Sequence, residues 1–205
     1  METSIAIIVQ IFIILYSIIL HEVAHGAVAE RLGDDTAKHA GRLTLNPIPH
    51  IDPIGTILLP LITFFGAGAI LGWARPVPYN HIALRGRYGE LKVALAGPLT
   101  NFMIAFFFAT LIRFDSAEVL EFSNFILGLF TYGVLLNVWL ALFNLIPIPP
   151  LDGSKVLFLL IDKRNYALRS FLERYGLMLL FAFIFFGSAI LRPLAMFFTR
   201  ALVGG

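Results

Sequence analysis

Long stretches without a charged side chain are the feature that most constrains this chain. A helix needs about 20 mostly apolar residues to cross the hydrocarbon core of a bilayer, so such stretches predict membrane helices. Charged residues make up 14% of the chain, against roughly 25% in soluble domains. We therefore expect an all-α fold, a polytopic membrane helical bundle surrounded by lipid bilayer. The charge-free runs cover residues 3–20, 53–74, 93–112, 122–151 and 175–191.

Composition also limits the organisation and the partners of the chain. We find no internal repeat and no flexible linker, so we expect a single integral-membrane domain over residues 1–205. There are no cysteines, which excludes disulfides and thiolate metal ligands and leaves His, Asp, Glu or Asn to hold any metal. Basic residues do not interleave with aromatic ones as in a nucleic-acid surface, so no nucleic-acid partner is expected.

The distribution of Lys and Arg predicts which ends of the apolar runs face the cytoplasm. Basic residues gather in the segments 31–52, 75–92 and 155–174, whereas the first four residues have none and 113–121 has one. Cytoplasmic loops carry an excess of Lys and Arg. The pattern therefore predicts an external N-terminus and three cytoplasmic segments.

This orientation has a consequence for the run 53–74, which would begin and end on the same side. We expect it to be re-entrant or a hairpin, because Pro60 and several glycines can break a helix there. The prediction is about four full spans plus this segment. The alternative is an ordinary span, since the run is long enough to cross.

The first apolar run leads into a pattern that is typical of metal sites. His21, Glu22 and His25 form an HExxH sequence in a helix expected to continue to Leu32, with Gly33 as its C-cap. Two histidines four residues apart lie on one helix face and can bind one zinc ion, while the adjacent glutamate can take a proton from a metal-bound water. Ionisable groups inside a membrane helix are costly and are usually functional. The alternative is a structural His–Glu cluster.

A third ligand must come from elsewhere, because zinc in hydrolases usually has three protein ligands and an open position. We favour Asp152, which follows a proline-rich break in an apolar run; irregular backbone at membrane depth is tolerated where it lines a cavity. Its alternative role is the N-cap of a helix starting near Ser154. Asp52 and Asp162 are the competitors, and Asp52 is expected to be mainly a turn or cap residue before Pro53.

The topology and the ligand set support each other. His21 and His25 are expected near the cytoplasmic end of the first helix, so the helix that precedes Asp152 must also end on that side. This holds only if the run 53–74 does not cross the membrane.

Together these motifs resemble the site-2 protease family of intramembrane metalloproteases. HExxH in the first helix is followed by Asn-x-x-Pro-x-Pro-x-Leu-Asp-Gly, which begins at Asn144. Gly97 and Asn101 match a Gly-x-x-x-Asn element between the two motifs. Segments that resemble the short prokaryotic members, without PDZ or CBS domains, are 41–47, 50–56, 72–80 and 96–101.

The resemblance implies one Zn²⁺ per chain, bound by His21, His25 and Asp152. It implies that Glu22 acts as general base and then acid, and that Asn144 lies near the substrate carbonyl or oxyanion. It further implies a prokaryotic cell membrane and a membrane-protein substrate cleaved in or near a transmembrane segment, while the Lys and Arg distribution predicts an active site towards the cytoplasm. Donor type alone leaves iron or cobalt open.

Two other classes of function are considered. A catalytically inactive relative that binds membrane proteins would keep the fold, but Glu22 and the full ligand set are present. A metal or proton transporter would show ionisable residues along a path through several helices, whereas here they cluster at one level. The sequence identifies neither the substrate nor the oligomeric state.

Overall fold

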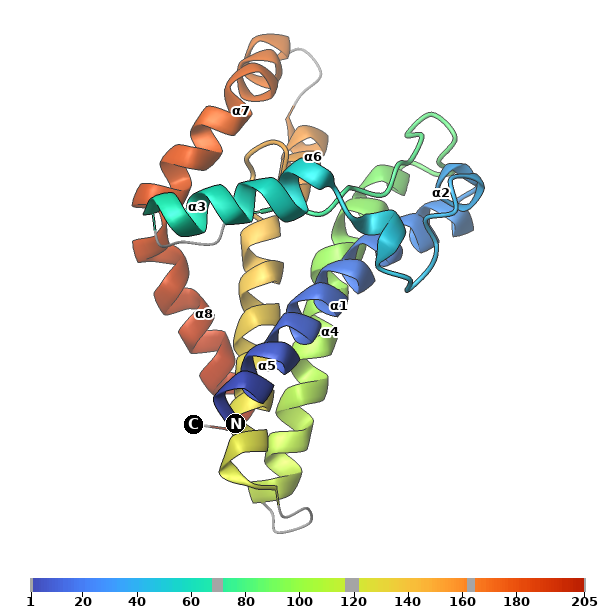
Figure 1. The fold of residues 1–205 in the computed structure, drawn as a ribbon. Helices are drawn as coiled ribbons and strands as arrows, with labels where there is room; N and C mark the ends of the chain where they lie inside the picture. The colour runs from blue at the N-terminus through green and yellow to red at the C-terminus, as the bar shows by residue number, and fades with distance from the viewer. Residues whose placement is uncertain (1, 68–71, 117–121, 162–164, 205) are drawn as a thin grey trace.

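The helical elements of the chain follow the predicted apolar runs closely. A computed structural model describes residues 2–67, 72–116, 122–161 and 165–204 (Figure 1). Within these ranges the assigned elements are all helices, which confirms the all-α prediction. They are α1 (Glu2–Arg31), α2 (Thr36–His39), η1 (Ile48–His50), η2 (Pro53–Leu58), α3 (Leu59–Ala67), α4 (Gly89–Ser116), α5 (Asn124–Asn144), α6 (Asp152–Leu160), α7 (Tyr166–Phe186) and α8 (Ser188–Val203).

Helices α1, α4 and α5 are long and apolar enough to cross a membrane, and α7 and α8 form a bent pair that can supply a fourth span. The chain is therefore an integral multi-pass membrane protein. Gly33 follows the end of α1 with a φ of 101°, the left-handed conformation expected of a glycine that terminates a helix.

The apolar run 175–191 is not one continuous helix. Helix α7 ends at Phe186 and α8 begins at Ser188, with an angle of 69° between the two helices. The break falls at Gly187, where an added Cβ would lie 2.4 Å from the ring of Phe183. Because glycine has no side chain, the Phe183 ring can fold over this corner.

The core lies between α4, α5 and α8, and α1 packs mainly against α4 beside it (Figure 1). Small alanines on α4 let the helices approach closely, which is how membrane helices gain packing energy. No helix was predicted after residue 191, so the contribution of α8 to this core was missed. The buried core residues are Ala105, Ala109, Val134, Val138, Leu142, Leu191 and Ala195.

The run 53–74 leaves the bundle and returns to the place where it started. The described helices of this run are η2, where the Asp52 carboxylate accepts hydrogen bonds from two backbone N–H groups, and α3. On the return, the Trp73 N–H donates to the Gly55 carbonyl (3.0 Å) and the Thr56 hydroxyl donates to the Trp73 carbonyl (2.9 Å). The two ends are thus bonded together, which confirms a returning segment and not a span.

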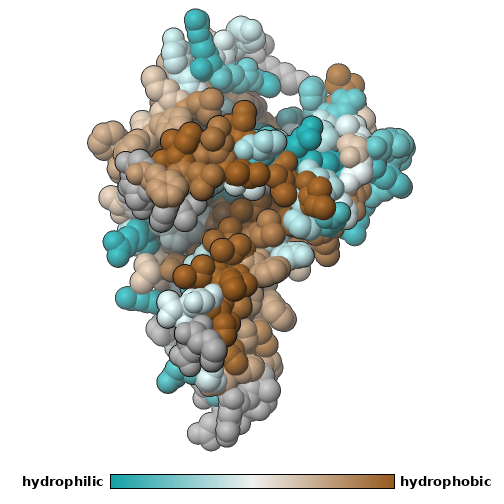
Figure 2. All heavy atoms as spheres, in the orientation of Figure 1, coloured by the Kyte–Doolittle hydropathy of each residue, from teal (hydrophilic) through white to brown (hydrophobic). Residues whose placement is uncertain are grey.

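Polar residues gather at one end of the molecule. Figure 2 shows hydrophilic side chains mainly around α2 and the start of α7, with a hydrophobic surface over α3 and along α1. The N-terminus, the end of α4 and the start of α5 lie at the other end (Figure 1). The three basic segments recognised in the sequence are therefore grouped at the same end of the bundle.

Candidate metal centre

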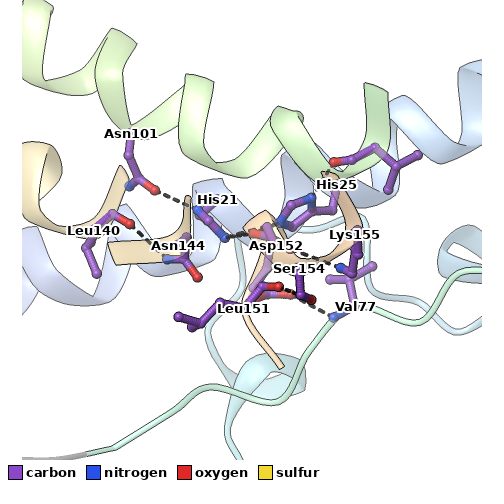
Figure 3. Close-up of polar contacts among 12 residues, drawn as sticks. His21, His25, Val77, Asn101, Leu140, Asn144, Leu151, Asp152, Ser154 and Lys155 are labelled. Carbon is purple, nitrogen blue, oxygen red and sulfur yellow. Dashed lines mark hydrogen bonds and ion pairs between the residues drawn. The ribbon is translucent and has the colours of Figure 1, made fainter. Parts of the chain in front are cut away.

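Two buried histidines on one face of α1 meet an aspartate from α6. The Nε2 atoms of His21 and His25 lie 3.1 Å apart. Asp152 Oδ2 lies 3.2 Å from the first and 3.0 Å from the second. All three side chains are buried, and their ligand atoms lie within 4.8 Å of one another (Figure 3). The structure thus brings together the three residues predicted as ligands.

The backbone after α5 delivers Asp152 to this position by turning back sharply. An added Cβ at Gly153 would lie 2.2 Å from the Leu145 carbonyl oxygen, so only glycine permits this close approach. Asp152 is the first residue of α6, whose N-cap is Leu151, and no side chain caps that helix end. The alternative role of Asp152 as an N-cap is therefore wrong.

The second ring nitrogen of each histidine has a partner that determines where the proton lies. His25 Nδ1 lies 2.6 Å from the Val93 carbonyl oxygen, which can only accept a hydrogen bond. His21 Nδ1 lies 2.6 Å from Asn101 Oδ1, and the Asn101 amide nitrogen is bonded to other acceptors. Both Nδ1 atoms therefore donate, and in the neutral rings both Nε2 atoms carry a lone pair.

This donor set fits a zinc ion. With neutral rings, two imidazole lone pairs and a carboxylate oxygen converge at 3.0–3.2 Å, an arrangement that suits a bound metal cation. A tetrahedral ion with bonds of about 2.0–2.1 Å separates its ligand atoms by about 3.3–3.4 Å. Helix α4 passes directly over the site, since an added Cβ at Gly97 would lie 2.4 Å from His25 Nε2.

The other carboxylate oxygen of Asp152 has a cationic partner. Lys155 Nζ lies 3.0 Å from Asp152 Oδ1, which leaves Oδ2 to face the histidines. The same ammonium lies 5.2 Å from the centroid of the Tyr79 ring, a cation–π distance. Burial raises the pKa of the Tyr79 hydroxyl, so this residue stays neutral beside the lysine.

Glu22 is held by the backbone of the extended segment 72–80. Its Oε2 accepts a hydrogen bond from the Val77 N–H at 2.8 Å. The carbonyl of the same peptide unit, that of Pro76, accepts from the buried guanidinium of Arg42 at 3.0 Å. A single peptide plane therefore connects a buried cation to the predicted general base.

The remaining predicted residues lie elsewhere. Asp52 caps η2 with bonds of 3.1 and 2.7 Å from the N–H groups of Ile54 and Gly55, so its prediction as a cap is confirmed. Asp162 lies outside the described residues. Asn144 is the last residue of α5, and its Nδ2 donates to the Leu140 carbonyl at 2.9 Å.

Several contacts of this site were not predicted from the sequence. Arg42 and Lys155 were counted only as charges in basic segments, and Asn101 was noted only as part of a motif. Polar residues inside apolar runs were the available signal for Asn101 and its partners. No sequence pattern could predict the hydrogen bond from the Val77 N–H to Glu22, because every residue except proline has a backbone N–H group.

Comparisons with known proteins agree with this geometry. The family model described as "Peptidase family M50" matches residues 116–187. The chain is 40% identical over 189 residues to the "Putative zinc metalloprotease YwhC" of Bacillus subtilis, covering 88% of this chain and 83% of the relative. No solved structure matches significantly.

More distant relatives have the same description. The "Putative zinc metalloprotease Rip2" of Mycolicibacterium smegmatis is 33% identical over 141 residues, which are 68% of this chain and 52% of the relative. The "Zinc metalloprotease MJ0392" of Methanocaldococcus jannaschii is 29% identical over 161 residues, 78% and 37% of the two chains. The fold and the site define a membrane zinc metalloprotease. The chain belongs to peptidase family M50, the site-2 protease family.

Proposed function

We propose that this protein is an intramembrane protease that hydrolyses peptide bonds in or near the transmembrane segments of membrane proteins. The observation that carries the proposal is the convergence of His21, His25 and Asp152 on one point inside a candidate membrane span. A hydrolytic site buried at this depth serves substrates that enter from the bilayer. Membership of a membrane protease family supports the same substrate class.

Each residue of the site has a proposed role. His21, His25 and Asp152 hold one zinc ion per chain. A bound zinc ion supplies a Lewis acid for the substrate carbonyl and lowers the pKa of a water ligand to about 7. Glu22 accepts a proton from the attacking water and returns it to the leaving nitrogen. The Val77 N–H, at 2.8 Å from its Oε2, keeps the Glu22 carboxylate oriented.

Asn144 is proposed to lie near the substrate carbonyl and to stabilise the developing negative charge. Its Nδ2 now donates to the Leu140 carbonyl at 2.9 Å. The amide must exchange this bond for one to the substrate. Loss of the Asn144 amide should therefore lower kcat more than it raises KM.

A substrate helix must unwind before attack, and we propose that the segment 72–80 receives the extended chain. One edge of this segment is occupied, since the N–H groups of Trp73, Arg75 and Val77 donate to Gly55, His50 and Glu22. In an extended chain the backbone groups of successive residues point to opposite edges, so the other edge carries those of residues 74, 76 and 78.

That free edge has a restricted set of donors. Pro76 and Pro78 have no N–H group, and the Pro76 carbonyl already accepts from Arg42, so the edge offers the N–H and carbonyl of Ala74 and the carbonyl of Pro78. A photo-crosslinker placed at residue 74 or 78 should capture a substrate, whereas one at Leu194 on α8 should not. Equal capture at all three positions would contradict this docking mode. We propose residues 144–151 as a second segment that contacts the substrate.

The proposed topology has an external N-terminus and the active site towards the cytoplasm, within one domain that spans residues 1–205. The grouping of the basic segments at one end supports it (Figure 2). The chain has no cysteine, so single introduced cysteines can be labelled cleanly. Lys38→Cys should react only after the membrane is opened, and Ser4→Cys should react in intact cells. The reverse pattern would contradict the topology.

Cleavage in liposomes tests the proposed activity. The purified protein would be reconstituted with zinc and a panel of transmembrane segments, each fused between two tags, with products mapped by mass spectrometry. Glu22→Gln should lower the rate by about 10²–10⁴-fold, the usual contribution of a general base, and should keep zinc. Equal cleavage by Glu22→Gln would refute the proposed role. Retained zinc with no cleavage of any segment would indicate a binding module.

A further inference from the structure

A chain of buried polar side chains connects three helices behind the metal centre. Ser17 on α1, Asn101 on α4 and Asn137 on α5 are each at most 3% exposed. They lie within the candidate membrane spans α1, α4 and α5, where an unpaired polar group is costly. The proposed catalytic steps use none of them.

The hydrogen bonds of Asn137 determine the orientation of its amide. Its Nδ2 donates to the Gly133 carbonyl and to Ser17 Oγ, both at 2.9 Å. The Gly133 carbonyl can only accept, so this side of the amide must be the nitrogen. The oxygen of Asn137 therefore points to Asn101, whose Nδ2 donates to it at 2.9 Å.

The orientation of Asn101 follows in the same way. Its Nδ2 also faces the Ser17 backbone carbonyl at 3.3 Å. Both neighbours of this nitrogen are acceptors, so Asn101 Oδ1 must be the atom that faces His21 Nδ1 at 2.6 Å. His21 then carries its proton on Nδ1 and directs the Nε2 lone pair to the point that it shares with His25 and Asp152.

We infer that Asn137 is a positioning residue for the proposed zinc site, which acts through Asn101 to hold the tautomer and the ring orientation of His21. It touches neither the metal position nor any of the three ligands in the contacts described above. The inference rests on the proposed function, since it assigns His21 as a ligand. It also makes the packing of α5 against α1 part of the metal site.

Zinc affinity is the first measurement. Residues that orient metal ligands typically contribute 10–100-fold to affinity. Competition with a chromophoric chelator in detergent should show zinc binding weakened at least about 10-fold in Asn137→Leu. Thr131→Val is the matched control, because the Thr131 hydroxyl donates to a carbonyl of its own helix α5 at 2.8 Å; its zinc affinity should not change.

A double variant separates a positioning role from a general packing role. If Asn137 acts through Asn101, then Asn101→Leu/Asn137→Leu should bind zinc no more weakly than Asn101→Leu alone. Losses that multiply, or wild-type affinity in Asn137→Leu, would overturn the inference. Ser17→Ala, which removes one acceptor of the Asn137 amide, is a milder variant and should show a smaller loss in the same direction.

The tautomer of His21 can be measured without metal. In ¹⁵N-histidine-labelled protein kept free of zinc, the nitrogen shift of His21 Nδ1 should be that of a protonated nitrogen. Asn137→Leu should reduce this preference, and Thr131→Val should keep it. An unchanged His21 tautomer in Asn137→Leu would refute the inference, even if the wild-type protein failed to bind zinc and the proposed function fell.

Discussion

At the scale of single residues, the site depends on one glycine, Gly97, as much as on the metal ligands. Gly97 lies directly over the two histidines, where an added Cβ would be 2.4 Å from His25 Nε2 and 2.5 Å from His21 Nε2. Real Cβ atoms do not approach other atoms so closely. Helix α4 can therefore cross α1 at this level only with glycine.

Gly97→Ala should abolish or strongly weaken zinc binding. The methyl group must push an imidazole away, and either His21 or His25 then loses its Nδ1 partner. We expect a loss of at least about 10-fold in zinc affinity. Gly128→Ala is the control, because an added Cβ there meets nothing within 4 Å. Full zinc affinity in Gly97→Ala would show that the helices are less closely packed than described.

Single residues also show what sequence reasoning can and cannot reach. HExxH and the Pro-rich motif before Asp152 predict ligands because chemistry and helical spacing limit the choices. Asn101 and Asn137 are conspicuous as polar residues in apolar runs. Their partners depend on how the helices rotate against each other, and no local pattern specifies that rotation.

At the scale of elements, the extended segment 72–80 is held by a buried cation. Arg42 is 5% exposed and donates to the carbonyls of Arg75 (2.6 Å) and Pro76 (3.0 Å), and also to Pro49. One guanidinium thus joins the chain around Pro49 to the segment 72–80, although η2 and α3 lie between them in the sequence. This bond set also keeps the Val77 N–H directed at Glu22.

Arg42→Met should loosen the segment 72–80. Each carbonyl that loses its bond to the guanidinium loses a hydrogen bond to a charged group, worth about 1.5–3 kcal/mol. Amide hydrogen exchange measured by mass spectrometry should therefore speed up in peptides that cover this segment. Arg75→Met removes the same charge from an exposed position and should leave exchange unchanged. Equal exchange in Arg42→Met and the wild type would contradict this role.

Element boundaries illustrate two different outcomes of prediction. The return of 53–74 was predicted correctly, because the distribution of Lys and Arg constrains both ends of a run at once. The corner at Gly187 was not, because glycine is common within membrane helices. The contact with the Phe183 ring that makes it a corner appears only in three dimensions.

At the scale of the whole molecule, a metal ion would join α1 to α6, two elements far apart in the chain. Such a ligand stabilises the folded state by about 4.1 kcal/mol when free zinc is 1,000 times its Kd. The family assignment and the polytopic fold were predictable from the composition and the paired motifs. The sequence predicted that Asp152 meets the histidines of α1, but it did not predict the backbone path that brings α6 there.

Removal of zinc should lower the thermal stability of the whole protein. A chelator should reduce the Tm in detergent, and added zinc should restore it, because only the folded state brings the three ligands together. His25→Ala should show no zinc-dependent change in Tm. A zinc-dependent shift of the same size in His25→Ala would mean that the ion binds elsewhere.

The zinc content of purified variants tests the central claim most directly. Elemental analysis would compare the wild type with Asp152→Ala and with Asp52→Ala, whose carboxylate caps η2. We predict about one zinc per chain in the wild type, loss of zinc in Asp152→Ala and full retention in Asp52→Ala. Full zinc in Asp152→Ala, or its loss in Asp52→Ala alone, would contradict the assignment of His21, His25 and Asp152 as the metal centre.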